Sequence, residues 1–193
     1  MIGSFKDFVS RQADIALVPG SFKPPHKGHY QMVSIYSGMA NDVVVLISAP
    51  SAKSQRVTKT GQVITPEVSK KIFDLYTSNL PNVTVEISSM PSPVGAAYQA
   101  LETLGGKRVI LGASKKDNDW KRWSGAQKWA QSKDLNIDIM DPEQTAVNVL
   151  DKADGTPYSA SNIRNNFDDP NAILEDIPEH VDPEQVQSIL ASL

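Results

Sequence analysis

Short apolar runs alternate along this chain with stretches that have helical patterning, and this alternation constrains the fold more than any other feature. The apolar runs predict strands at about 15–18, 42–48, 82–88, 108–111 and 137–140. The intervening stretches predict helices at about 28–37, 65–76, 92–104 and around the tryptophans Trp120, Trp123 and Trp129. Alternating strands and helices form a parallel sheet with right-handed crossovers and helices on both faces. We therefore expect an α/β protein with a five-stranded parallel sheet, whose ligands bind beyond the carboxyl ends of the strands.

The 193 residues suffice for one α/β domain with a well-filled core. We see no linker that would separate a second domain, so we expect a single domain over 1–193. Its core covers about 13–150, and in the C-terminal helical part, 151–193, a turn at 154–157 precedes a helix from about 158 and a last helix over 185–193. A short amphipathic helix around Phe5 and Phe8 is expected before the first strand.

The charge and the residue usage exclude several classes of function. The net charge of -3 gives no overall basic surface, so we expect no nucleic-acid partner, and an anionic ligand must meet a local basic site. The chain has no cysteine, which rules out a disulfide framework, a thiolate nucleophile and a Cys-ligated zinc site. No run approaches the roughly 20 apolar residues of a membrane span, and the first residues lack the apolar core of a signal peptide. We expect a cytoplasmic protein with no membrane partner.

Residues 20–29 read Gly-Ser-Phe-Lys-Pro-Pro-His-Lys-Gly-His and contain two of the three histidines of the chain, His26 and His29. They join the first predicted strand to the first predicted helix. At this position in an α/β protein, backbone N–H groups and the helix dipole both favour an anion, so the decapeptide predicts phosphate chemistry. A His-x-x-His pair is also half of a zinc site. Only His180 remains to complete one, so we expect no metal held by the protein itself.

A second segment, 158–164, reads Tyr-Ser-Ala-Ser-Asn-Ile-Arg and opens a predicted helix. A serine at the start of a helix commonly caps it, which is a structural role. An arginine one turn further on adds a fixed charge that suits phosphate oxygens. Taken by itself, the segment predicts a capped helix start followed by a basic side chain.

The two segments together resemble the paired signatures of the HxGH nucleotidyltransferase superfamily, GxFxPxHxGH and ISSTxIR or ISxTxVR. Their order and their spacing of about 130 residues also suit that superfamily. The resemblance implies a Rossmann-like fold. It also implies transfer of a nucleoside monophosphate, AMP from ATP, onto a phosphate-bearing acceptor with release of pyrophosphate. Such a reaction depends on holding two polyanions in line and on stabilising charge at the transferred phosphoryl group.

The resemblance further implies roles for individual residues. His26 and His29 would stabilise charge at the α-phosphate, and Gly28 would keep a side chain away from the nucleotide. Arg164 would grip the β- and γ-phosphates. Lys23 points at the phosphates or is a solvated loop charge. The implied catalytic residues are His26, His29, Lys23 and Arg164, and the implied phosphate-binding residues are Gly20, Ser21, Phe22 (through its backbone N–H), Gly28, Ser159, Ser161 and Asn162.

Two further stretches carry candidate residues with open alternatives. The polar, basic segment 49–64 looks like a mobile loop that either closes over the triphosphate as a lid or is simply solvated. The residues after the fourth strand bind a ribose or base, cap the next helix or pack against it. The candidates for acceptor or lid contacts are Lys53, Arg56, Lys59, Asp117, Asp119 and Trp120.

The identity of the acceptor is the least constrained part of the interpretation. The decapeptide looks most like adenylyltransferases for nicotinamide mononucleotide of the GRFxPxHxGH type, with Ser21 in place of the arginine. Pantetheine-phosphate adenylyltransferases share Gly-Ser-Phe but usually carry threonine at the position of His26. Cytidylyltransferases share the histidines but typically carry an acid at the position of Lys23. The resemblance thus implies a Mg²⁺-dependent adenylyltransferase that uses ATP, with nicotinamide mononucleotide as the leading acceptor. The alternatives are those other two enzyme types or a non-catalytic nucleotide-binding module, and a homo-oligomer is compatible with each.

Overall fold

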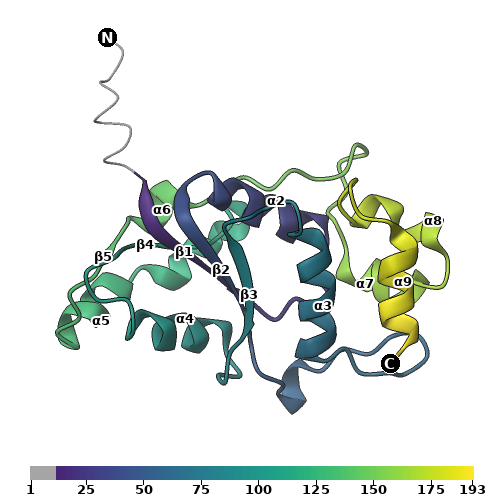
Figure 1. The fold of residues 1–193 in the computed structure, drawn as a ribbon, viewed down its shortest axis with the longest axis horizontal. Helices are drawn as coiled ribbons and strands as arrows, with labels where there is room; N and C mark the ends of the chain where they lie inside the picture. Colours follow the sequence, from purple (N-terminus) through teal and green to yellow (C-terminus); the bar gives the residue numbers. More distant parts are fainter. Residues whose placement is uncertain (1–11) are drawn as a thin grey trace, which may run out of the picture.

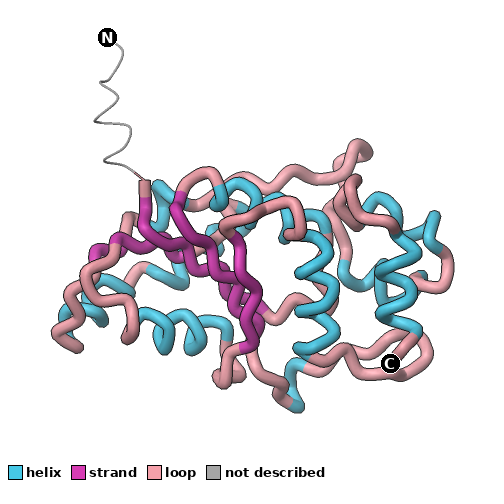
Figure 2. Tube along the Cα trace, viewed as in Figure 1, coloured by secondary structure: helices cyan, strands magenta, loops and turns pink. Residues whose placement is uncertain are grey.

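The computed structural model describes residues 12–193, and the expected helix around Phe5 and Phe8 lies outside them. One parallel sheet forms the centre of the molecule (Figures 1 and 2). Its strands are β1 (Ala13–Gly20), β2 (Ala40–Ile47), β3 (Val83–Ile87), β4 (Arg108–Leu111) and β5 (Asp138–Ile139), in the order β3-β2-β1-β4-β5. The prediction of a five-stranded parallel sheet in an α/β protein is confirmed.

The sheet order places a crevice beside β1. The chain crosses from β1 to β2 on one side, and it returns to the other side of β1 with β4. The register pairs Gly20 with Ile47 and Leu17 with Leu111, so the carboxyl ends of β1, β2 and β4 lie together. In an open parallel sheet this reversal of strand order is where ligands bind.

Helices cover both faces of the sheet (Figure 1). On one face, α2 (Lys27–Ser37) and α3 (Pro66–Tyr76) pack their apolar sides into one core cluster. On the other face, α4 (Pro93–Leu101) and α5 (Ala126–Ser132) pack into a second cluster around the buried Trp123. This double cover explains the uninterrupted apolar runs of the central strands, which are buried on both sides.

The C-terminal helices lie against α3, on the side away from the sheet (Figure 1). They are α7 (Ala160–Asn166), α8 (Pro170–Ile173) and α9 (Pro183–Ala191), with a short 3-10 turn, η3 (Leu174–Asp176), between the last two. Their buried side chains, Ile163, Ile173, Val186 and Leu190, belong to the same core cluster as α2 and α3. The two distant signature segments are thereby held on one side of the molecule.

Several helices begin where the sequence predicts. Thr65 caps α3 by accepting the Val68 N–H, and a proline follows at the first helical position. Ser92 caps α4 in the same way. Another short 3-10 turn, η1 (Ala52–Ser54), and a four-residue helix, α6 (Pro142–Thr145), were not expected. None of the helices in residues 12–193 combines the length and the apolar character that crossing a membrane requires.

The tryptophan-rich stretch differs from the prediction of one helix. It forms a 3-10 segment, η2 (Lys116–Trp123), followed by the separate helix α5. Asp117 and Asn118, each with a φ of 55°, stand in the left-handed region at its start. Aspartate and asparagine tolerate this conformation better than other side chains, but two such residues interrupt helical hydrogen bonding.

Tyr36 fastens α2 to the carboxyl end of β4. Its side chain is fully buried, and its hydroxyl lies 2.9 Å from the carbonyl oxygen of Ala113 and 3.0 Å from that of Thr145. The hydroxyl oxygen also accepts the backbone N–H of Ala113 at 3.0 Å. Burial raises the pKa of Tyr36 to about 12, so the hydroxyl keeps its proton. The helix that carries His29 is therefore fixed against the strand that leads to the opposite wall of the site.

Candidate functional site

The decapeptide leaves the carboxyl end of β1 and enters α2, as predicted. Phe22 has a φ of 45° and a buried side chain that folds back over Gly20. A Cβ atom at Gly20 would stand 2.4 Å from the Phe22 ring, so only glycine fits there. The Phe22 ring also meets His29 edge-on, with 4.9 Å between ring centroids. The turn thus supports the His29 side chain through Phe22, in addition to the backbone role expected for it.

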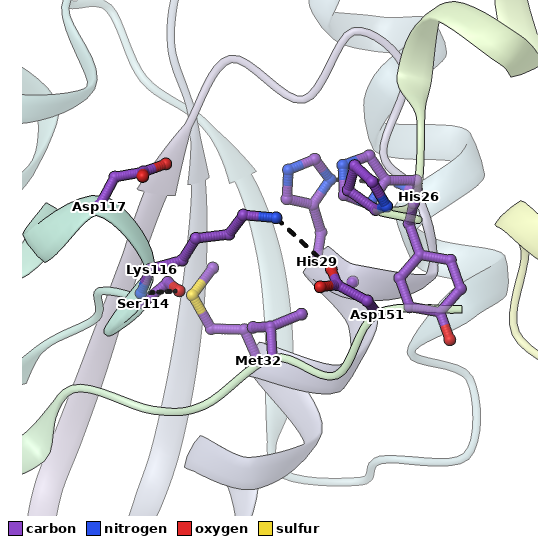
Figure 3. Close-up of a pocket in the computed structure, with 11 residues that line it drawn as sticks. His26, His29, Met32, Ser114, Lys116, Asp117 and Asp151 are labelled. Carbon is purple, nitrogen blue, oxygen red and sulfur yellow. Dashed lines mark hydrogen bonds and ion pairs between the residues drawn. The ribbon is translucent and has the colours of Figure 1, made fainter. Parts of the chain in front are cut away.

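The two histidines form a stacked pair at the start of α2 (Figure 3). Their ring centroids are 3.7 Å apart, with the planes inclined by 24°. The backbone N–H of His26 donates to Nδ1 of His29 at 3.1 Å. Because Nδ1 of His29 accepts this bond, a neutral His29 carries its proton on Nε2. The ring is then a hydrogen-bond donor toward whatever Nε2 faces.

Both histidines are neutral at physiological pH. Burial lowers the pKa of His26 to about 4, against an opposing effect of the Asp176 charge. Burial and, after it, the neighbouring His26 hold the pKa of His29 well below its usual 6.5. The Nδ1 atom of His26 is buried and hydrogen-bonds no atom in residues 12–193. A neutral, pre-positioned donor pair suits an anion without the cost of burying two cations.

A cavity of about 300 Å³ opens beside the histidines, beyond the carboxyl ends of β1 and β4; we call it the histidine cavity. Figure 3 shows the two imidazoles facing Ser114, Lys116 and Asp117, which follow β4. A third wall comes from the irregular segment between α6 and α7. The lining residues are His26, Gly28, His29, Met32, Ser114, Lys116, Asp117, Val149, Asp151, Pro157 and Tyr158.

Gly28 has a structural reason of its own, beside the expected role toward a nucleotide. A Cβ atom there would stand 3.1 Å from both the His26 ring and a methyl group of Val149. The glycine therefore leaves room for the His26 imidazole and for the segment that covers it. The expectation was that Gly28 keeps a side chain away from a nucleotide.

A second cavity of about 230 Å³ lies between the two signature segments, and we call it the basic pocket. It is lined by Ser21, Lys23, Arg56, Ala160 and Arg164. Arg164 reaches across it, donating from Nη1 to the carbonyl oxygen of Lys23 at 2.6 Å and from Nη2 to Ser161 Oγ at 2.7 Å. The two signatures, 141 residues apart at this contact, are thus joined directly.

The positive charges that line the basic pocket repel one another. Desolvation lowers the pKa of Lys23, and the charge of Arg56 lowers it further. The same two causes, in the same order, lower the pKa of Arg164. Cations brought this close to one another repel, and an anion between them would relieve the repulsion. The pocket is therefore suited to a phosphate or pyrophosphate group.

The segment 49–64 is docked on the C-terminal helices. Its Lys59 backbone N–H donates to the carbonyl oxygen of Arg164 at 3.1 Å, and the Lys59 side chain pairs with Asp168. Gln62 donates from Nε2 to the carbonyl oxygen of Leu193 at 2.7 Å. Of the three basic candidates in this segment, Arg56 lines the basic pocket, while Lys53 is exposed and lines neither cavity.

The candidates after β4 separate in the same way. Asp117 lines the histidine cavity. Asp119 instead pairs with Arg122 at 3.4 Å, and Trp120 packs against the second core cluster. Of these three predicted residues, Asp117 lines the histidine cavity, and Asp119 and Trp120 do not.

Asn162 does not face either cavity. Its side-chain amide donates to the carbonyl oxygen of Ala172 at 2.9 Å and to Oδ2 of Asp176 at 2.7 Å. Ser159 caps α7 by accepting the Asn162 N–H at 3.0 Å, as predicted. The expectation that Asn162 binds phosphate is not supported by this direction, because its amide is used inside the fold.

Several cavity residues had no signal in the sequence. Val149 and Asp151 come from a stretch without periodic patterning, and Met32 looked like any apolar position of a helix. Lys116 could have been found from its place after β4, where it donates to Asp151 at 3.4 Å. Irregular segments are positioned by tertiary packing, which periodicity does not report.

The donor set around the cavities bears on metal binding. Within residues 12–193, no three His, Cys, Asp or Glu side chains gather as a metal site. Asp117 and Asp151 are the carboxylates that line the histidine cavity. Two carboxylates on the lining of this cavity fit a hard cation that takes most of its oxygen ligands from a bound polyphosphate.

We expect the stability of the protein to fall in acid through His26. The pKa of about 4 in the folded chain is below the ordinary 6.5, so the unfolded chain binds the proton more readily. The contribution is complete above pH 6.5 and is lost as the pH falls toward 4, by about 3 kcal/mol. Urea unfolding at about pH 7 and about pH 4 measures it. The variant His26→Gln should lose less stability over this range, and an equal loss in both proteins would contradict the assignment.

Comparisons with known proteins bear on the family and the fold of the chain. No protein-family model matches the chain. Over 109 residues the chain is 28% identical to the phosphopantetheine adenylyltransferase of Leuconostoc mesenteroides subsp. mesenteroides and 30% identical to that of Leuconostoc citreum. The matched stretch is 56% of this chain, and it spans 60% and 61% of these relatives, less than two thirds of their length.

Solved structures are similar over nearly the whole chain. Two are crystal structures of a bifunctional NMN adenylyltransferase/ADP ribose pyrophosphatase from Francisella tularensis, one of them in complex with AMP and a manganese ion. They have TM-scores of 0.57 and 0.53 at 13% and 14% identity, and cover 94% of this chain and 50% and 51% of theirs. This likeness confirms the Rossmann-like fold. The sequence and structure matches together support a relationship to the nucleotidyltransferase superfamily.

Proposed function

We propose that this protein is an adenylyltransferase that moves AMP from ATP to a phosphate-bearing acceptor and releases pyrophosphate. One observation carries the proposal. Arg164 of the second signature donates to the Lys23 carbonyl of the first, so the basic pocket includes part of the same turn that carries the stacked, neutral histidines. Such an arrangement offers cations to a leaving pyrophosphate and neutral donors to the phosphoryl group being transferred.

In the proposed reaction, an oxygen of the acceptor phosphate forms a bond to the α-phosphorus of ATP. The bond from that phosphorus to the bridging oxygen breaks, and pyrophosphate leaves with the electron pair. The acceptor phosphate is already an anion, so the protein needs no strong general base. His29 would donate its Nε2–H to an α-phosphate oxygen, since its Nδ1 is held by the His26 backbone. Lys23, Arg56 and Arg164 would bind the β- and γ-phosphates.

A divalent cation, Mg²⁺ in this proposal, would neutralise charge on the triphosphate oxygens. Asp117 and Asp151 are the cavity carboxylates that would hold it or its water ligands. The remaining chemistry rests on positioning. The stacked histidines are fixed by the turn, and the basic pocket is fixed by the contact between the two signatures.

The histidine cavity has a mixed lining that suits a small phosphorylated acceptor or the nucleoside part of ATP. Met32, Val149 and Tyr158 offer apolar surface, and Ser114 and Lys116 offer polar groups. We keep nicotinamide mononucleotide as the leading acceptor, supported by the complete His-x-x-His pair. Phosphopantetheine is the second candidate, supported by the two relatives that match in sequence.

A pyrophosphate-release screen tests the proposal. ATP and CTP are each combined with Mg²⁺ and with nicotinamide mononucleotide, phosphopantetheine, flavin mononucleotide or alcohol phosphates. We expect release that requires both ATP and one acceptor, with the adenylylated product identified by mass spectrometry. Pyrophosphate release that occurs with CTP and an acceptor, but not with ATP and any acceptor, would assign a cytidylyltransferase. Binding of ATP without release for any acceptor would assign a non-catalytic nucleotide-binding module and contradict the proposal.

A further inference from the structure

We propose that Asp176 is a positioning residue, which fixes the start of α7 and thereby the Arg164 side of the basic pocket. This inference rests on the proposed function, because it concerns the pocket assigned to the β- and γ-phosphates. Asp176 ends η3, and its side chain is fully buried. It belongs to neither signature and lines neither cavity.

The carboxylate of Asp176 is bonded on both oxygens. Oδ1 accepts the backbone N–H of Ser159 at 2.7 Å. Oδ2 accepts from the side-chain amide of Asn162 at 2.7 Å and from Nζ of Lys152 at 2.9 Å. The Lys152 side chain is itself only 13% exposed, so this is an ion pair taken almost wholly out of water. Charge-assisted bonds of this kind are short and directional, and they set the positions of their donors.

Two of these three bonds reach the second signature. Ser159 and Asn162 occupy the N-cap and the first turn of α7. Arg164 lies two residues after Asn162, and it donates to Ser161 and to the Lys23 carbonyl. Because α7 is a single short helix, a tilt of its first turn displaces the Arg164 guanidinium. Asp176 acts on the pocket only through these neighbours and touches no phosphate.

The third bond reaches the wall of the histidine cavity. Lys152 belongs to the irregular segment that supplies Val149 and Asp151 to that wall. One buried carboxylate therefore holds the edges of both cavities at a fixed separation. A buried ion pair is costly to form, and an apolar cluster of the same volume commonly gives equal or greater stability. The direction of the three bonds, toward the site from one anchor, is what an apolar cluster could not supply.

The test replaces the carboxylate with its neutral isostere, Asp176→Asn. The new side chain still accepts the Ser159 N–H, but it turns an amide donor toward the donors of Asn162 and Lys152. Inorganic pyrophosphate is the probe, and its Kd is measured by calorimetry at a temperature where both proteins are folded by circular dichroism. We expect pyrophosphate to bind about tenfold more weakly to the variant. The KM for ATP should rise in step, while kcat at saturating ATP changes less, because the lost contact is made before and during transfer alike.

Two further variants make the result interpretable. Asp138→Asn, at an exposed ion pair with Arg108 at the other end of the sheet, should leave the pyrophosphate affinity unchanged. Should Asp176→Asn fail to fold, Asn162→Ala removes one arm of the same network and should weaken pyrophosphate binding severalfold. A folded Asp176→Asn or Asn162→Ala that binds pyrophosphate like the wild type overturns the inference.

The inference and the proposed function fail in different ways. Pyrophosphate that binds the wild type and weakens in the variant supports the positioning role, even where no acceptor yields product and the proposed function is overturned. Adenylyl transfer with an unchanged pyrophosphate affinity in the variant overturns the positioning role alone. A wild-type protein that binds no pyrophosphate overturns both.

Discussion

Replacing His29 with alanine is expected to lower the rate of adenylyl transfer by about two to four orders of magnitude, while ATP still binds. The imidazole offers an Nε2–H donor at the cavity, because its Nδ1 accepts the His26 backbone N–H. Alanine removes the donor and leaves the basic pocket, which is built from other residues. Single-turnover pyrophosphate release gives the rate, and calorimetric titration gives the Kd for ATP.

The third histidine of the chain supplies a matched control. His180 pairs its Nε2 with the carbonyl oxygen of Tyr76 at 2.9 Å and lines neither cavity. His180→Ala should therefore retain the transfer rate even where it costs some stability. A normal rate in a folded His29→Ala protein would contradict the mechanism.

Replacing Arg164 is expected to affect ATP binding more than any other single change. Arg164→Ala should raise the KM for ATP by about 10- to 100-fold, because the pocket loses a fixed charge and the link to the Lys23 carbonyl. Arg164→Lys should recover little of this loss. A single ammonium group cannot bond Lys23 and Ser161 with the planar fork that Arg164 uses now.

Steady-state kinetics with ATP varied at saturating acceptor measure the effect. Lys70→Ala is the matched control, since Lys70 forms an exposed ion pair with Asp74 on α3 and lines neither cavity. A KM for ATP that is the same in Arg164→Ala and in the wild type would remove the basic pocket from the mechanism.

The strands and most helices were predictable because the burial of their side chains leaves a pattern that can be recognised within a few residues of sequence. The core strands are buried on both faces and therefore read as runs of Val, Ile and Leu, as in 43–47. Helix caps such as Thr65 depend on neighbouring residues, so they were predictable as well. The single helix predicted around Trp120, Trp123 and Trp129 was wrong, because Trp120 and Trp123 lie in the 3-10 segment η2 and only Trp129 lies in α5, although the spacing of the three tryptophans is helical.

Most of the predicted site residues that line the cavities belong to the two signatures, and Arg56 and Asp117 are the predicted residues outside them that also do so. The two segments meet where Arg164 bonds the Lys23 carbonyl oxygen. Only the presence of both motifs in one chain indicated that they would be in contact.

Val149 and Asp151 belong to a stretch that lacks periodicity, so nothing local indicates that they line the cavity. The direction of Asn162, and the buried carboxylate of Asp176 toward which it points, depend on how α8 and η3 fold back on α7. Such contacts depend on packing between elements and have no local pattern in the sequence.

The bond from Arg164 to Lys23 has a consequence for how the molecule acquires its binding capacity. It closes a loop of 141 residues, so the basic pocket exists only after the C-terminal helices have docked on α3. The central sheet needs no residue beyond Ile139, so it can pair before the C-terminal helices dock, but it has no complete polyphosphate site at that stage. A polyphosphate that binds only the finished arrangement selects it by mass action and holds the last helices in place. The substrate would thus act as a late-stage clamp on the chain that transforms it.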